Sequence, residues 1–124
     1  MNSHFRPYSV LVADDDPTVA LLAQVALPAA EFSTTVVASG DAAIERFARQ
    51  PFDIVLLDVE MPGCDGIDAC REIRRSNAAV PVLLVTGRND PAFLALVKEL
   101  GVEHIAKPVD WGSLAALIRR RFGR

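Results

Sequence analysis

One stretch of the sequence decides the fold: Asp53-Ile54-Val55-Leu56-Leu57-Asp58-Val59-Glu60-Met61-Pro62-Gly63-Cys64-Asp65-Gly66. Its apolar run, residues 54–57, ends on the carboxylate of Asp58, and a Pro-Gly turn follows. An unbroken run of this kind is typical of a strand buried on both faces of a parallel sheet. Asp58 is then expected at the carboxyl edge, where open α/β sheets bind ligands. Because an unpaired buried charge is costly, Asp58 needs a cation, water or a reaction there.

Length and composition indicate one globular domain. The 124 residues suffice for one hydrophobic core, and 51% of them are hydrophobic. The net charge of −3 carries no nucleic-acid signature, so we expect no direct nucleic-acid binding. We find no basic leader with a cleavage site and no apolar run near the ~20 residues of a membrane helix. The expectation is a cytoplasmic protein without membrane association.

Apolar runs and turn residues alternate along the chain as five strand–helix pairs. The sequence predicts strands at residues 9–13, 34–38, 54–57, 80–85 and 102–106. It predicts helices at residues 17–27, 42–49, 66–75, 91–100 and 110–122. Strict alternation implies a parallel sheet with helices on both faces, and right-handed crossovers leave few topologies.

Four of the five predicted strands end on polar side chains: Asp14 with Asp15, then Asp58, Thr86 and Lys107. The ends of parallel strands point the same way, so we expect these side chains to converge. Clustered carboxylates repel one another unless a divalent cation lies between them, and Mg²⁺ is typically held by carboxylates, waters and phosphate oxygens. Lys107 supplies a point charge suited to phosphate. The set predicts a phosphoryl site beside Mg²⁺, with a carboxylate available as nucleophile.

These residues resemble the receiver domain of two-component response regulators, of the chemotaxis-regulator type. The resemblance rests on four segments in the right order and spacing: residues 11–17, 53–66, 82–87 and 106–108. It implies a three-layer, doubly wound, flavodoxin-like fold whose five parallel strands lie in the order 2-1-3-4-5. It also implies that residues 1–124 form a single receiver domain, either natural or cut from a longer response regulator.

Carried over residue by residue, the resemblance makes Asp58 the phosphoacceptor. Asp15 is then the direct Mg²⁺ ligand, and Asp14 acts largely through water. Asp58 itself and the backbone carbonyl of Glu60 complete the protein ligands, and Mn²⁺ is an alternative metal. The side chain of Glu60, together with Arg88, lies where the family tunes the lifetime of the phosphoryl group, and the two could pair across the site mouth.

The resemblance also implies the groups that bind and report the phosphoryl group. Thr86 would bind a phosphoryl oxygen, and Lys107 would pair with Asp58 before phosphorylation and with the phosphoryl group after it. Gly87 is small and leaves access to the site open. A cis bond is expected before Pro108. His104 stands where the family has its switch aromatic, and because an imidazole can take up a proton near pH ~6.5, we expect weaker or pH-dependent switching.

The implied function is a phosphorylation-controlled signalling switch that catalyses only its own phosphorylation and dephosphorylation and is not a metabolic enzyme. The donor would be a sensor histidine kinase or a histidine phosphotransfer protein. Output would pass through the face formed by the fourth helix, the fifth strand and the last helix. The downstream effector stays open, and a homodimer is compatible with this reading.

Two other functions compete with this one. Asp14-Asp15-Asp16-Pro17-Thr18 formally matches the Asp-x-Asp-x-Thr signature of haloacid dehalogenase-type phosphatases, in which Asp14 would be the nucleophile and Asp16 the general acid. That reading leaves Asp58 and its Met-Pro-Gly turn unexplained. The second alternative is a scaffold with the same fold that is never phosphorylated.

The first predicted helix is apolar almost throughout. We expect three of its residues to face the sheet: Leu21, Leu22 and Val25. Four would then face outward: Val19, Ala20, Ala23 and Leu27. Scattered small apolar residues are normal on surfaces, but this group could also be a docking patch for the phosphodonor protein.

Overall fold

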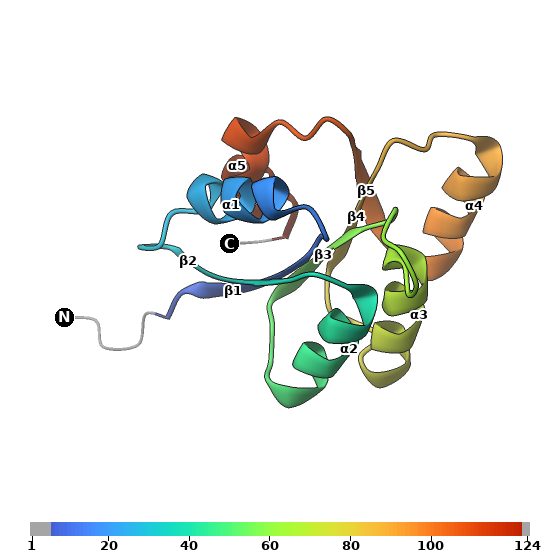
Figure 1. Cartoon of the computed structure of the whole chain (residues 1–124), viewed down its shortest axis with the longest axis horizontal. Helices are drawn as coiled ribbons and strands as arrows, with labels where there is room; N and C mark the ends of the chain where they lie inside the picture. The colour runs from blue at the N-terminus through green and yellow to red at the C-terminus, as the bar shows by residue number, and fades with distance from the viewer. Residues whose placement is uncertain (1–5, 123–124) are drawn as a thin grey trace.

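The computed structural model describes residues 6–122, which form five strands that are each followed by a helix (Figure 1). The strands are β1 (Tyr8–Ala13), β2 (Phe32–Val37), β3 (Ile54–Asp58), β4 (Val82–Thr86) and β5 (Glu103–Ala106). The helices are α1 (Pro17–Ala26), α2 (Gly40–Arg49), α3 (Gly66–Ser76), α4 (Pro91–Leu100) and α5 (Leu114–Phe122). Within residues 6–122, every helix is too short or too polar to cross a membrane.

The sheet is parallel throughout, with the strand order β2-β1-β3-β4-β5, so the expected topology is confirmed. Element ends differ from the expected ones by a few residues. β4 begins at Val82 rather than residue 80, because Pro81 has no N–H to donate to a ladder. The last helix begins with a 3₁₀ turn, Trp111–Ser113, before α5.

β3 is the central strand and is buried on both faces. Ile54 and Leu56 pack in a cluster with residues of α1 and α5, whereas Val55 and Leu57 pack in a second cluster with residues of α2, α3 and α4. Figure 1 shows these layers, with α1 and α5 together on one side of the sheet and α2 and α3 on the other. Burying one aliphatic side chain of this kind stabilises the folded state by about 1.5–3 kcal/mol. Because successive β3 side chains point to opposite faces, this one strand helps to hold the helices on both sides of the sheet.

The inward face of α1 is the opposite of the expected one. Ala23 and Leu27 are buried, whereas Leu21 and Val25 are 61% and 73% exposed. Both stripes have helical spacing, so the apolar pattern alone does not choose between them. The small Ala23 lets α1 approach the sheet closely, and Leu27 fills the cluster just after the helix ends. The outward apolar patch therefore consists of Leu21, Leu22 and Val25.

Candidate functional site

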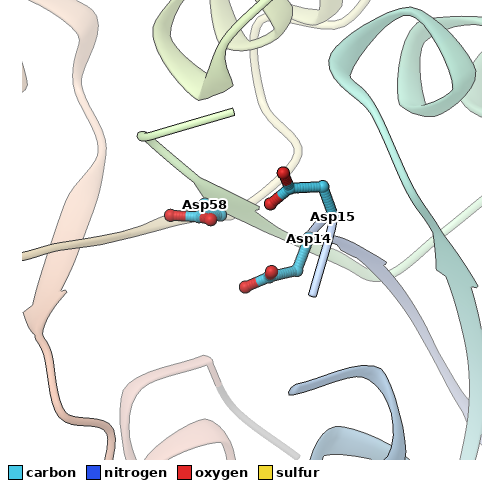
Figure 2. Close-up of side chains that lie close together, drawn as sticks. All are labelled: Asp14, Asp15 and Asp58. Carbon is cyan, nitrogen blue, oxygen red and sulfur yellow. The ribbon is translucent and has the colours of Figure 1, made fainter. Parts of the chain in front are cut away.

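Three carboxylates converge at the carboxyl edge of the sheet (Figure 2). Asp14 and Asp15 directly follow β1, Asp58 is the last residue of β3, and β1 and β3 are neighbours. One oxygen from each carboxylate lies within 4.8 Å of the others. Asp14 and Asp58 are only 6% and 4% exposed, whereas Asp15 is exposed. Three negative charges are thus held close together, two of them almost out of water.

The electrostatics of this cluster favour a cation. Burial is the main cause that raises the pKa of Asp14, and the negative charges of Asp58 and Asp15 add to it. The backbone N–H of Asp16, which donates to Asp14 Oδ1 at 2.9 Å, acts in the opposite direction. The donor set is all oxygen and carboxylate-rich, which is what Mg²⁺ requires, so the residues present fit that ion.

Lys107 follows β5 and reaches the acidic cluster from the other side. Its Nζ lies 2.7 Å from Asp58 Oδ1 and 3.3 Å from Glu60 Oε1. Burial lowers the pKa of the Lys107 ammonium, but its hydrogen bonds to Asp58 and Glu60 and their charges outweigh burial, so the net pKa is raised. The Lys107–Pro108 bond is cis. The backbone N–H of Lys107 donates to the carbonyl of Thr86 at 3.0 Å, which ties the ends of β5 and β4 together.

Thr86 ends β4 and is fully buried. Its hydroxyl donates to Glu60 Oε2 at 2.7 Å and accepts the backbone N–H of Arg88 at 3.0 Å. The carboxylate of Glu60 therefore bridges Thr86 and Lys107. The sequence predicts a ligand role for the carbonyl of Glu60 but not this bridge, because residue spacing carries no signal for the rotamer of a long side chain.

Arg88 pairs with Asp90 and not with Glu60, although the sequence allowed a Glu60–Arg88 pair across the site mouth. Its Nε and Nη2 bind the Asp90 carboxylate at 3.0 and 3.1 Å, and its guanidinium lies over the Phe93 ring, 5.0 Å from the centroid. Asp90 is two residues away in the same loop and binds the guanidinium through both carboxylate oxygens, whereas the oxygens of Glu60 are engaged by Thr86 and Lys107. His104 is half-buried on β5, and its ring meets Phe93 edge-to-face at 5.6 Å.

Two glycines border the site in different surroundings. A Cβ added at Gly66, the first residue of α3, would lie 2.4 Å from the backbone carbonyl oxygen of Asp58. Only glycine lets α3 start this close to the end of β3. A Cβ added at Gly87, next to Thr86, would meet nothing within 4 Å, so the approach beside Thr86 is open.

Two further acidic residues of the motifs, Asp16 and Asp65, cap helices. Asp16 Oδ1 accepts the backbone N–H of Thr18 at the start of α1, and Asp65 Oδ1 accepts that of Asp68 at the start of α3. Asp16 is thus an N-cap. The phosphatase alternative would need it as a general acid.

A cleft of about 560 Å³ lies over the cluster. Its walls include the three carboxylates and Lys107, together with Val109 and Trp111 from the segment after β5. Trp111 packs against the α1–α5 cluster and also lines this cleft. The cleft is large enough for a phosphoryl group with its metal and waters.

Comparison with known proteins agrees with this geometry. A family model described as response regulator receiver domain matches residues 10–119. The chain is 34% identical over 116 residues to the DNA-binding response regulator MtrA of Mycolicibacterium smegmatis, covering 93% of this chain and 50% of that protein. It is 38% identical over 118 residues to the transcriptional regulatory protein CseB of Streptomyces coelicolor, covering 92% and 50%.

The chain thus spans about half the length of these curated relatives. Among solved structures, the chemotaxis protein CheY4 of Vibrio cholerae superposes with a TM-score of 0.85 at 23% identity, covering 93% of this chain and 98% of that one. At that identity the likeness speaks for the fold alone, whereas the family match covers most of the sequence. The chain belongs to the family of response regulator receiver domains.

Proposed function

We propose that this receiver domain is a phosphorylation-controlled switch in which Asp58 accepts the phosphoryl group. One observation carries the proposal: Asp58 is a buried strand-end carboxylate with Lys107 Nζ 2.7 Å away and two further carboxylates beside it. A lysine and a carboxylate cluster at one site suit a phosphoryl group with a divalent cation. We further propose that residues 1–124 form one such domain.

The metal would be held by Asp14, Asp15, Asp58 and the backbone carbonyl of Glu60. Mg²⁺ is the proposed ion, and Mn²⁺ could replace it. When bound, the ion supplies positive charge that offsets the charge of the phosphoryl oxygens during transfer. Asp15 is exposed and can hold the ion directly, whereas Asp14 is bonded to Asp16 through one oxygen and offers the other.

In the proposed reaction, a carboxylate oxygen of Asp58 attacks the phosphorus of a phosphohistidine on a sensor histidine kinase or a histidine phosphotransfer protein. The new O–P bond forms as the P–N bond breaks. The electron pair of the P–N bond leaves with the imidazole nitrogen, which takes up a proton. Lys107 stabilises the charge on the phosphoryl oxygens. Later attack by water on phosphorus releases inorganic phosphate and restores the carboxylate.

The conformational output would begin at Thr86 and Lys107. Their side chains would turn toward the phosphoryl oxygens, and the hydrogen bond from the Lys107 N–H to the Thr86 carbonyl couples their backbones. β5 carries His104, whose ring packs on Phe93 of α4. We propose that the shift reaches the face formed by α4, β5 and α5, and that a downstream effector or a second copy binds there.

The phosphodonor protein would dock on α1. The outward apolar patch of Leu21, Leu22 and Val25 borders a hollow of about 340 Å³ that Trp111 also lines. Trp111 also lines the phosphoryl cleft, so this side chain lies between the hollow beside the patch and the cleft that contains Asp58. MtrA is named a DNA-binding regulator and CseB a transcriptional one. We propose that this receiver likewise controls a downstream effector.

Trp111 is the single tryptophan of the chain, and its fluorescence tests the proposal. Titration with Mg²⁺ should change the emission saturably, and this change should be lost in Asp15→Asn. Acetyl phosphate with Mg²⁺ should then cause a second change that is absent in Asp58→Asn. A second change of equal size in Asp58→Asn would overturn the assignment of Asp58.

A further inference from the structure

The carboxylate of Glu60 contacts Thr86 and Lys107, the two side chains that the proposed function assigns to the phosphoryl oxygens. Glu60 Oε2 accepts the hydroxyl hydrogen of Thr86 at 2.7 Å, and Glu60 Oε1 lies 3.3 Å from Lys107 Nζ. A hydroxyl has one hydrogen to donate. Thr86 therefore cannot serve Glu60 and a phosphoryl oxygen at the same time.

The Glu60 side chain is able to leave this position while its backbone stays. Its backbone N–H donates to Asp58 Oδ1 at 3.2 Å, which holds the main chain at the site. The side chain is 47% exposed, so the carboxylate can rotate into solvent and be hydrated there, without the cost of a buried unpaired charge. Arg88 is engaged by Asp90 and does not hold Glu60 in the site.

We propose that the Glu60 carboxylate is an internal substitute for the phosphoryl group, bound to Thr86 and Lys107 in the resting domain and displaced when Asp58 is phosphorylated. This inference rests on the proposed function and adds a residue that sets its rate. Glu60 acts in two ways. Its negative charge repels an anionic phosphodonor, and its oxygens take the one hydroxyl hydrogen of Thr86 and one of the three N–H donors of Lys107. The Glu60 side chain thus competes with the phosphoryl group for Thr86 and Lys107.

The test compares wild type with Glu60→Gln and Glu60→Ala. Acetyl phosphate and Mg²⁺ should form the Asp58 adduct about tenfold faster in Glu60→Ala, the ratio contributed by one charge-assisted hydrogen bond. Glu60→Gln removes the charge but keeps an acceptor for Thr86, so its rate should lie between. Beryllofluoride with Mg²⁺, an equilibrium probe of the same donors, should bind more tightly in the same order.

Glu99→Gln is the matched control, because Glu99 is exposed near the far end of α4 and its replacement changes the net charge equally. Its adduct rate and beryllofluoride affinity should equal those of wild type. Equal rates and affinities in wild type and both Glu60 variants would overturn the inference and leave the proposed function standing. If no variant forms an Asp58 adduct or binds beryllofluoride, the proposed function itself fails and the inference falls with it.

Discussion

Lys107 Nζ lies 2.7 Å from Oδ1 of Asp58, and this ion pair joins the end of β5 to the end of β3 across β4. Asp58 is nearly buried and shares its surroundings with Asp14 and Asp15. Lys107 therefore supplies positive charge to an otherwise negative cluster. The same ammonium contacts Glu60, so one side chain balances two carboxylates.

Replacing Lys107 by Met should weaken both the fold and the reaction. The Asp58 carboxylate would be left among negative charges, and the free energy of unfolding in EDTA should fall by about 1–3 kcal/mol, less than for a fully buried pair because Lys107 is 37% exposed. Adduct formation with acetyl phosphate should slow at least about tenfold. Thermal unfolding and intact-mass kinetics measure the two effects. Lys98→Met, at an exposed site on α4, is the control, and equal behaviour of the two variants would contradict this role.

The stability of the metal-free protein should depend on pH through Asp14. Burial raises the pKa of Asp14, so the folded state binds this proton more tightly than the unfolded chain does. Ionised Asp14 therefore lowers the free energy of unfolding at a pH above the pKa that Asp14 has in the folded state. This penalty disappears as the pH falls through that pKa and Asp14 takes up its proton. In EDTA at pH 7, Asp14→Asn should raise Tm by a few degrees. A gain of about 1 kcal/mol in the free energy of unfolding produces a shift of that size in a domain of this length.

The difference in Tm between Asp14→Asn and wild type should shrink as the pH approaches 4. Mg²⁺ at pH 7 should raise the Tm of wild type more than that of the variant. Calorimetry across pH, with and without Mg²⁺, measures both trends. A constant difference in Tm between the two proteins at every pH would show that the Asp14 proton is not linked to folding.

Gly66→Ala should damage the site through the backbone. Its Cβ would lie 2.4 Å from the Asp58 carbonyl oxygen, and neither the strand end nor the helix start can yield easily. The expected loss is about 1–3 kcal/mol of unfolding free energy, typical of overpacking, together with weaker Mg²⁺ binding. Denaturant unfolding and Trp111 fluorescence report these changes. Gly87→Ala enters open space and should unfold like wild type; similar losses in both variants would refute the close-approach argument.

Val25→Glu tests the docking patch on α1. Val25 is 73% exposed, so the variant should fold normally, yet a charge there should slow phosphotransfer from a histidine kinase that phosphorylates the wild-type chain. Phosphorylation by acetyl phosphate should not change. Leu94→Glu, on the exposed side of α4, should leave both reactions intact. If the kinase phosphorylates Val25→Glu as fast as wild type, the phosphodonor protein docks on another surface.

The sequence predicts those parts of the fold and site that depend on strand periodicity. Asp14 directly follows β1, Asp58 and Thr86 end β3 and β4, and parallel strands bring such ends to one edge. The inward face of α1 could not be predicted, because two apolar stripes share helical spacing and only packing selects Ala23. The Glu60 bridge and the pairing of Arg88 with Asp90 depend on rotamers, which residue spacing does not encode. The effect of His104 on switching stays a prediction.

Intact mass after incubation with acetyl phosphate, with Mg²⁺ or EDTA, identifies the phosphoacceptor when wild type, Asp58→Asn and Asp14→Asn are compared. We expect one phosphoryl adduct on wild type that needs Mg²⁺ and is absent from Asp58→Asn. An adduct that survives in Asp58→Asn and disappears in Asp14→Asn would make Asp14 the nucleophile and rule out Asp58.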